Sequence, residues 1–198
     1  MNIVFDLGNV LLRWDPRFLF TQYFASEMEM EWFLAHVCNN DWNLEQDRGR
    51  SFADAVAELT AKFPEHAEAI AAFDTRWHET LPHAIDGTVA ILDELVARQA
   101  PVYAITNWNS DKFRETRQRF PFLGKFRDIV VSGDEKLVKP DAAIYQVLFQ
   151  RNGLRAEDCL FIDDNAANVR GAEAVGMQAH HFTSPEKLRK ALVEMAVL

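Results

Sequence analysis

The chain has 198 residues, a length that suits one compact domain or a domain with a small insert. Hydrophobic residues make up 48% of it, which is enough to build a sizeable core and excludes a disordered chain. The formal net charge is −9, and this negative balance disfavours general binding to nucleic acid or to an anionic membrane surface.

The chain opens with a short apolar run that ends on a carboxylate. Residues 1–10 read Met-Asn-Ile-Val-Phe-Asp-Leu-Gly-Asn-Val, so β-forming residues precede Asp6 and a turn follows it. Asp6 is therefore predicted at the carboxyl end of a strand, where open α/β sheets bind their ligands. Asp6 and Gly8 also interrupt the apolar stretch, so this opening does not predict a signal peptide, and we expect a cytoplasmic protein.

The segment that follows, residues 15–82, contains no convincing strand. Its apolar residues recur at helical spacing, with an irregular stretch between the second and third helices. The segment therefore predicts an all-helical cap inserted after the first strand and able to close over a bound ligand. The expected helices cover residues 16–25, 27–37, 51–63 and 65–79.

From residue 83 onward, strands alternate with helices. This alternation predicts a doubly wound parallel α/β sheet covered by helices on both faces, with residues 1–14 and 83–198 as its core. A last helix is expected after Ser184, which is a suitable N-cap because Pro185 follows it. The expected strands are 101–106, 128–132, 159–163 and 177–181, and the helices between them are 88–98, 110–119, 142–152 and 165–175.

Polar residues follow four of the predicted strands, and in a doubly wound sheet these strand ends converge on one crevice. Their chemistry suits phosphoryl transfer, because a carboxylate can attack phosphorus while amides, hydroxyls and a lysine hold the phosphate oxygens. Several carboxylates in one crevice would repel each other unless a cation lay between them, and hard oxygen ligands favour Mg²⁺. The four points are Asp6, Thr106-Asn107, Lys139-Pro140 and Asp163-Asp164.

These four segments, in this order and together with the position of the helical cap, resemble the haloacid dehalogenase (HAD) superfamily of hydrolases. The resemblance covers essentially the whole chain and implies the Rossmann-like core of that superfamily. The Asp-Leu-Gly-Asn-Val opening is similar to that of sugar-phosphate phosphatases of the glucose-1-phosphatase type. The segments that carry the resemblance are residues 5–10, 105–107, 138–141 and 161–165.

The resemblance implies a role for each matching residue. Asp6 would be the catalytic nucleophile, and Lys139 would pair with it and with the phosphoryl oxygens. Thr106 and Asn107 would bind the phosphoryl group. Trp108 follows Asn107 and is expected near the mouth of the site, where lining the substrate pocket and packing against the cap are both open interpretations. A Mg²⁺ ion would be held by Asp6, the Gly8 carbonyl, Asp163 and Asp164.

Gly8 is a departure from the family pattern. Most phosphatases of the family have an aspartate at this position, which protonates the leaving group and contributes roughly 10²- to 10⁴-fold to the rate. Asp15 could substitute for it, although Asp15 before Pro16 fits a helix N-cap better. Trp42, Glu45 and Arg48 could face the substrate, but core packing and solvated charge are simpler interpretations.

The sequence thus predicts a Mg²⁺-dependent hydrolase of a small phosphorylated metabolite, such as a sugar phosphate, acting through an aspartyl-phosphate. Two alternatives stay open at this point. A 2-haloacid dehalogenase would use the same aspartate without a second acid, and a binding protein could keep the fold without turnover. No nucleic-acid or membrane partner is expected, and the sequence leaves monomer and dimer open. Cys38 and Cys159 lack metal-ligand spacing and are expected to be reduced, buried thiols.

Overall fold

The computed structural model describes all 198 residues and contains one five-stranded, entirely parallel sheet. The strand order β3-β2-β1-β4-β5 places the first strand at the centre of the sheet, as in doubly wound folds. The register pairs Phe5 of β1 with Ala104 of β2 on one side and with Ile162 of β4 on the other. The strands are β1 (Asn2–Phe5), β2 (Val102–Thr106), β3 (Ile129–Val131), β4 (Cys159–Asp163) and β5 (Gln178–His181).

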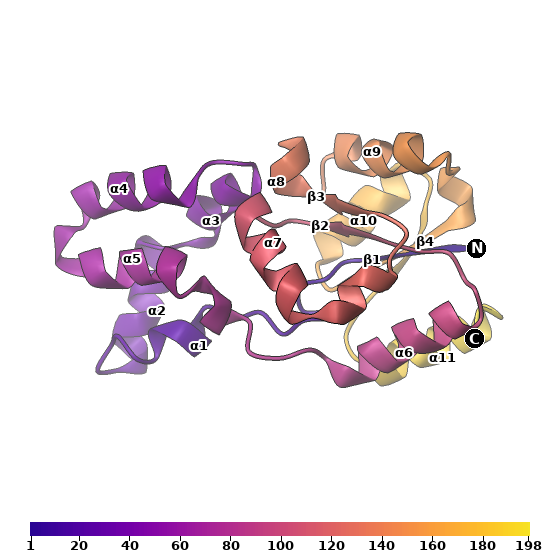
Figure 1. The fold of residues 1–198 in the computed structure, drawn as a ribbon, viewed down its shortest axis with the longest axis horizontal. Helices are drawn as coiled ribbons and strands as arrows, with labels where there is room; N and C mark the ends of the chain where they lie inside the picture. The colour runs from indigo at the N-terminus through magenta and orange to yellow at the C-terminus, as the bar shows by residue number, and fades with distance from the viewer.

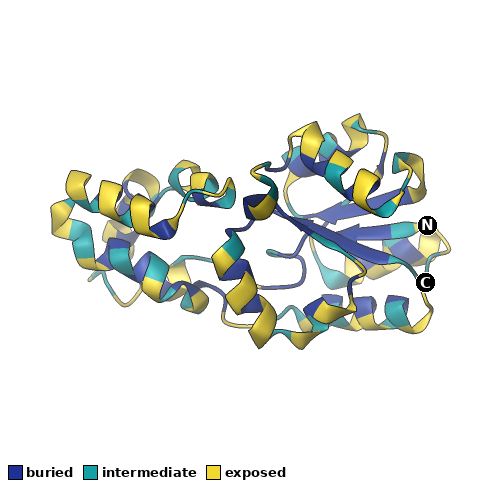
Figure 2. Cartoon of the chain, turned by 45° about the horizontal axis from the view of Figure 1, so that its top comes forward, coloured by how far each residue is buried: buried dark blue, intermediate teal, exposed yellow.

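Helices cover both faces of the sheet (Figures 1 and 2). Alternate residues of a strand point to opposite faces, so Ile3 and Phe5 pack into a cluster with residues of α6 and α11, whereas Val4 packs with residues of α9 and α10. The helical elements of this part are α6 (Asp86–Ala97), α7 (Ser110–Arg119), η3 (Pro121–Lys125), α8 (Ser132–Glu135), α9 (Ala142–Asn152), η4 (Ala156–Asp158), α10 (Ala166–Ala174) and α11 (Pro185–Glu194).

A group of helices between β1 and α6 lies beyond one end of the sheet, on the left in Figure 1. We use the name cap for residues 15–82, which contain it. Its aromatic core is built on Phe20, Phe33 and Phe73, with ring centroids 4.9 Å apart for the first two and 5.6 Å apart for the first and third. The cap elements are α1 (Arg17–Phe20), α2 (Glu27–His36), α3 (Asn40–Asp47), α4 (Phe52–Lys62), η1 (Pro64–His66), α5 (Ala67–Thr75) and η2 (Trp77–Thr80).

Three expectations for the cap were wrong in detail. The stretch expected to be irregular contains α3, which begins because the side chain of Asn39 accepts the backbone N–H of Trp42 as an N-cap. The helix expected over 16–25 is the single turn α1, followed by hydrogen-bonded turns. The helix expected over 65–79 is α5 with a 3-10 turn on either side.

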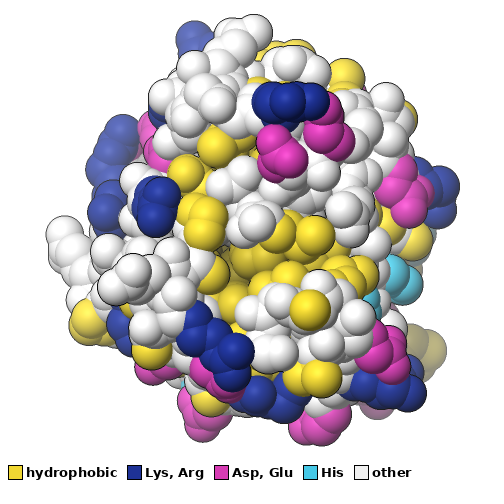
Figure 3. Space-filling view, turned by 90° about the vertical axis from the view of Figure 1, so that its right-hand side faces the viewer, with side chains coloured by type: hydrophobic (Ala, Val, Ile, Leu, Met, Phe, Trp, Pro, Cys, Tyr) yellow, Lys and Arg dark blue, Asp and Glu magenta, His cyan; other side chains and the backbone are white.

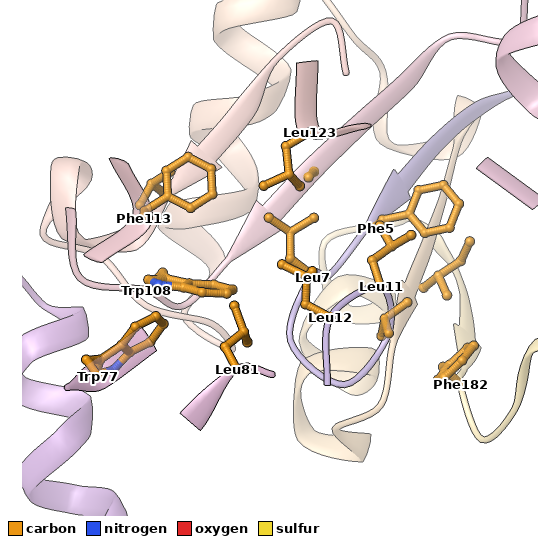
Figure 4. Packing of buried hydrophobic residues seen from close by; sticks show 14 of the residues in the cluster. Phe5, Leu7, Leu11, Leu12, Trp77, Leu81, Trp108, Phe113, Leu123 and Phe182 are labelled. Atoms are coloured by element: carbon orange, nitrogen blue, oxygen red, sulfur yellow. The ribbon is translucent and has the colours of Figure 1, made fainter. Parts of the chain in front are cut away.

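Two antiparallel linkers join the cap to the sheet. The backbone N–H of Arg13 donates to the carbonyl of His83, and that of Ile85 donates to the carbonyl of Leu11. Apolar side chains continue from Phe5 through Leu7 and Leu12 toward Trp77, so cap and sheet share one buried cluster (Figure 4). This shared packing holds the cap over the carboxyl ends of the strands.

The opposite end of the sheet carries both chain termini (Figure 1). Figure 3 views this end, where apolar side chains gather in a shallow hollow and charges of both signs surround them. No helix of the protein is long and apolar enough to cross a membrane. Cys38 and Cys159 are free and buried, as expected.

Candidate active site

The centre of the site is a buried lysine between two carboxylates. The ammonium of Lys139 lies 2.8 Å from Oδ1 of Asp6 and 2.7 Å from Oδ2 of Asp163, and the lysine side chain has no solvent exposure. Asp6 follows β1, Asp163 ends β4, and Lys139 precedes α9, so three segments far apart in sequence meet here. A buried cation between two anions compensates part of the cost of removing all three charges from water.

Asp163 is committed to contacts within the protein. Its Oδ1 accepts the backbone N–H of Asn165 at 2.7 Å, and the side-chain amide of Asn168 donates to both of its oxygens at 3.1 and 3.2 Å. Together with the bond from Lys139, these contacts occupy the carboxylate, which does not line the cavity beside Asp6. Asp163 therefore orients Lys139, while Asp6 and Asp164 line the cavity.

Three carboxylates gather closely enough to hold a metal ion. Oxygens of Asp6, Asp163 and Asp164 lie within 4.8 Å of one another. The pKa of Asp6 is raised to about 7, because burial and the charges of Asp163 and Asp164 outweigh the lowering effect of Lys139. Burial also raises the pKa of Asp164, again helped by Asp163. One lysine thus leaves the cluster with uncompensated negative charge, and its oxygen donors suit a hard divalent cation.

The loop after β2 holds Lys139 in position. The side-chain carbonyl of Asn107 accepts the backbone N–H of Lys139 at 2.8 Å, and its amide donates to the Lys139 carbonyl at 3.1 Å. Thr106 ends β2 and lies beside Asn107 on the wall of the cavity. Asn107 therefore acts first as a backbone clamp, a role that the sequence did not suggest.

A cavity of about 230 Å³ lies between these strand ends and the cap. Its floor is polar and contains Asp6, Gly8, Thr106, Lys139 and Asp164. The apolar part of its lining consists of four aromatic side chains: Trp14, Phe52, Trp77 and Trp108. Every residue assigned to the site from the sequence lines this cavity except Asp163.

Trp108 both lines the cavity and packs against the cap. Its ring centroid is 5.4 Å from that of Trp77, and it meets Phe113 of α7 edge-on (Figure 4). The two roles are compatible because an indole has two faces and an edge. Trp108 thereby ties the loop after β2 to the cap.

Gly8 and Asp15, the two positions considered for a general acid, differ in their surroundings. An added Cβ at Gly8 would meet no atom within 4 Å, so the space that an acid would occupy there is open. Asp15 instead accepts the backbone N–H of Arg17 at 2.9 Å and pairs with the Arg17 guanidinium at 3.2 Å. It lines a different cavity. The expected N-cap role was wrong in detail, because the N-cap of α1 is Pro16 and Asp15 lies one residue before it.

The cap residues that face the cavity were missed from the sequence. Asn43 and Asp47, one turn apart on α3, line it. Of the three cap residues considered, Trp42 packs on Phe52 and Phe73, and Glu45 and Arg48 form a solvated pair at 3.8 Å. The signal for Asn43 and Asp47 was their four-residue spacing, which has meaning only once residues 40–47 are known to be helical.

Comparison with known proteins agrees with this geometry. A family model described as haloacid dehalogenase-like hydrolase matches residues 3–181. The chain is 28% identical over 182 residues to a sesquiterpene phosphatase of Aspergillus oryzae, an alignment that spans 91% of this chain and 88% of the relative.

Solved structures show the same fold. A HAD family enzyme of Bacteroides thetaiotaomicron, in complex with magnesium and inorganic phosphate, superposes with a TM-score of 0.70 at 20% identity, covering 92% of this chain and 94% of that one. An L-2-haloacid dehalogenase of Xanthobacter autotrophicus with chloropropionic acid covalently bound has a TM-score of 0.63 at 15% identity, covering 100% and 84%. The family match includes Asp6, Lys139 and Asp164, and the chain belongs to the haloacid dehalogenase-like hydrolases.

Proposed function

We propose that the protein is a Mg²⁺-dependent phosphatase that hydrolyses a small phosphorylated metabolite through an aspartyl-phosphate on Asp6. The observation that carries the proposal is the contact between Asp6 and the buried Lys139 beside Asp164, at the floor of the cavity between the strand ends and the cap. Carboxylate nucleophiles that form covalent intermediates are an established route for difficult hydrolyses.

Each residue of the cavity floor has its own role in the proposed reaction. Asp6 supplies the attacking oxygen, Lys139 orients that carboxylate and offsets charge on the phosphoryl oxygens, and Thr106 offers a hydroxyl to the same oxygens. Asp6, Asp164 and the Gly8 carbonyl would hold Mg²⁺, which would neutralise further negative charge when bound. Asp163 acts through Lys139, because both of its oxygens are already bonded.

The aromatic lining restricts the leaving group. Trp14, Phe52, Trp77 and Trp108 face a cavity of about 230 Å³, which favours a small leaving group that presents an apolar surface. The face of a sugar ring and a terpenoid chain both meet that description. The relative from Aspergillus oryzae is a sesquiterpene phosphatase, which places isoprenoid phosphates beside sugar phosphates in the panel to test.

The acidic cluster argues against the dehalogenase alternative. A 2-haloacid substrate carries its own carboxylate, which would lie near three protein carboxylates with Lys139 as the one neutralising side chain. Like charges at such distances disfavour binding. A phosphate ester bound with a divalent cation meets no such obstacle.

The experiment measures release of inorganic phosphate from sugar, isoprenoid and aryl phosphates, and of chloride from 2-chloropropionate, with Mg²⁺ and with a chelator. We expect phosphate release with Mg²⁺ only, and its loss in Asp6→Asn, which replaces the nucleophile by a neutral group of the same shape. Asp158→Asn, on the exposed surface, is the control and should keep wild-type turnover.

Chloride release without metal would instead support a dehalogenase. Absence of turnover on the whole panel, with Mg²⁺ and phosphate still bound, would support a binding protein. Retention of more than a small fraction of activity in Asp6→Asn would remove Asp6 as the nucleophile.

A further inference from the structure

The proposed reaction releases an alkoxide unless a proton reaches the leaving oxygen. The residues around Asp6 do not supply one: Gly8 has no side chain, Asp15 is bonded to Arg17 at another cavity, and both oxygens of Asp163 are occupied. Asp164 belongs to the cluster suited to a cation. The acid must therefore come from another part of the cavity wall.

Asp47 is the remaining carboxyl group that lines the cavity. It is the last residue of α3, and Asn43 lines the cavity from the preceding turn, so this face of the helix looks onto the floor that carries Asp6. Asp47 forms no ion pair, in contrast to Asp6 and Asp163, which share Lys139. It lies on the cap side, where the leaving group of a phosphate held at Asp6 would extend.

The end of α3 is hydrogen-bonded directly to α8 and to the loop after β2. The hydroxyl of Ser132 donates to the backbone carbonyl of Asp47 at 2.6 Å and accepts the backbone N–H of Trp108 at 2.8 Å. The side-chain amide of Asn109 donates to the carbonyls of Gln46 and Arg50 at 3.3 and 3.4 Å. Asp47 is therefore positioned by the loop after β2 and by α8, which are parts of the same framework that holds Asp6.

A close approach of two backbones completes this attachment. Gly49 has a φ of +100°, and a Cβ there would lie 3.1 Å from the carbonyl oxygen of Gly133 in α8. Glycine is the residue that combines this backbone conformation with such proximity. The attachment of α3 thus depends on the glycine at position 49 and on the backbone of α8 that it approaches.

The surroundings of Asp47 keep both of its protonation states accessible near neutral pH. The pKa of Asp47 is raised to about 7: burial raises it most and the charge of Asp6 adds to this, while the backbone of Asn109 and the charge of Lys139 act in the opposite direction. Asp164 is the other charged group on the cavity wall. A proton donor with a pKa close to the working pH is the most effective general acid and base.

We propose that Asp47 is the general acid and base of the reaction, supplied by the cap in place of the acid that Gly8 lacks. This inference rests on the proposed phosphatase function. In the first step Asp6 forms a bond to phosphorus, the bond from phosphorus to the leaving oxygen breaks, and the proton of Asp47 passes to that oxygen. In the second step water attacks phosphorus and gives its proton to Asp47, and the bond to Asp6 breaks, releasing inorganic phosphate.

The test compares kcat/KM for aryl and alkyl phosphates of increasing leaving-group pKa in wild type and Asp47→Asn. We expect a weak dependence in wild type and a steep one in the variant, which should lose roughly 10²- to 10⁴-fold on alkyl phosphates and far less on p-nitrophenyl phosphate. Asp41→Asn is the matched control, because Asp41 lies on the same helix, is exposed and does not line the cavity. Mg²⁺ binding should persist in both variants.

Two further measurements distinguish a catalytic role of Asp47 from a structural one. Gly8→Asp in the Asp47→Asn background should recover part of the alkyl phosphate activity, because the space beside Gly8 is open. Wild-type kcat/KM on alkyl phosphates should fall as pH rises above about 7, where Asp47 loses its proton, and Asp47→Asn should lack that fall.

The outcomes of the two proposals are distinguishable. If wild type hydrolyses phosphate esters and Asp47→Asn reduces activity equally for all leaving groups, or not at all, Asp47 is not the acid and the phosphatase proposal stands. If wild type binds Mg²⁺ but hydrolyses no phosphate ester, the function itself fails and Asp47 has no reaction to serve.

Discussion

At the scale of single residues, Lys139 does more than balance charge. It contacts a carboxylate that faces the cavity and one that faces the protein interior, and its own backbone is clamped by Asn107. Burial lowers the pKa of the Lys139 ammonium, but the neighbouring charges of Asp163 and Asp6 outweigh it and hold the pKa above its usual value. Lys139 thus stays a cation in the interior, and the geometry of Asp6 depends on it.

Replacement of this lysine should cost stability as well as activity. Lys139→Met keeps the volume but leaves Asp6 and Asp163 as buried, unpaired anions, so we expect the free energy of unfolding to fall by about 3–5 kcal/mol at pH 7. Folded Asp6 already holds its proton more tightly than the unfolded chain does, with a pKa raised to about 7 from 3.8. Because Lys139 lowers this pKa, its removal should raise the pKa further, so protonation stabilises the variant more than wild type and the loss should be smaller at pH 5 than at pH 7. Urea denaturation at the two pH values measures both effects.

The other buried lysine provides the control for that measurement. Lys112 pairs with Asp74 at 2.7 Å, but the Asp74 side chain is 31% exposed and remains hydrated without its partner. Lys112→Met should therefore destabilise the protein less than Lys139→Met does. Equal losses would mean that the pairing of Lys139 contributes nothing specific to the interior of the site.

At the scale of secondary structure elements, α3 is the element that connects the cap to the chemistry. Its first turn is capped by Asn39, and its last residue is bonded through its carbonyl to Ser132. The buried Gln46 and the partly buried Trp42 hold its other face in the cap, with the Trp42 ring 5.5 Å from that of Phe73. A short helix thereby has one face in the cap core and another on the cavity.

The close approach at Gly49 should be measurable. Gly49→Ala forces a side chain into a φ of +100° and against the Gly133 carbonyl, so we expect a loss of about 1–3 kcal/mol in the free energy of unfolding. Gly124→Ala is the control, since an added Cβ there meets no atom within 4 Å and should change stability by less than about 0.5 kcal/mol. Thermal unfolding of both variants decides the matter, and equal midpoints would show that α3 can shift away from α8 without cost.

At the scale of the whole molecule, the arrangement of charge couples metal binding to stability. The chain is acidic overall, and its one cluster suited to a metal places three carboxylates around a single lysine. An ion that binds this cluster in the folded state, and not in the unfolded chain, must stabilise the fold by mass action.

Mg²⁺ should therefore raise the midpoint of thermal unfolding. At about 100 times its dissociation constant, we expect a gain of about 2.7 kcal/mol. Asp164→Asn should abolish most of this gain, because Asp164 offers oxygens that are not bonded within the cluster, whereas the surface variant Asp158→Asn should keep it. A midpoint that does not respond to Mg²⁺ in wild type would remove the metal from the proposed function.

Much of the sheet could be predicted from the sequence, because strands and helices of a parallel α/β fold have local patterns. The apolar runs ending at Asp6, Thr106 and Asp163 each became a strand within the same sheet. The doubly wound arrangement could be predicted because strands alternate with helices along the chain. This arrangement brings residues at the predicted strand ends into one cavity. Adjacent parallel strands end at the same edge of a sheet, so a one-dimensional pattern suffices to bring those residues together.

The tertiary structure alone decided which of these residues are free to act. Asp163 and Asp164 are adjacent in sequence, yet the first is bonded to Lys139, Asn165 and Asn168 while the second faces the cavity. Asn107 became a clamp, and the cap turned Asn43 and Asp47 toward Asp6 in place of the neighbouring Trp42, Glu45 and Arg48. A sequence pattern specifies residue type and local periodicity, whereas hydrogen-bond partners, burial and the rotation of a helix about its axis depend on contacts between segments far apart in the chain.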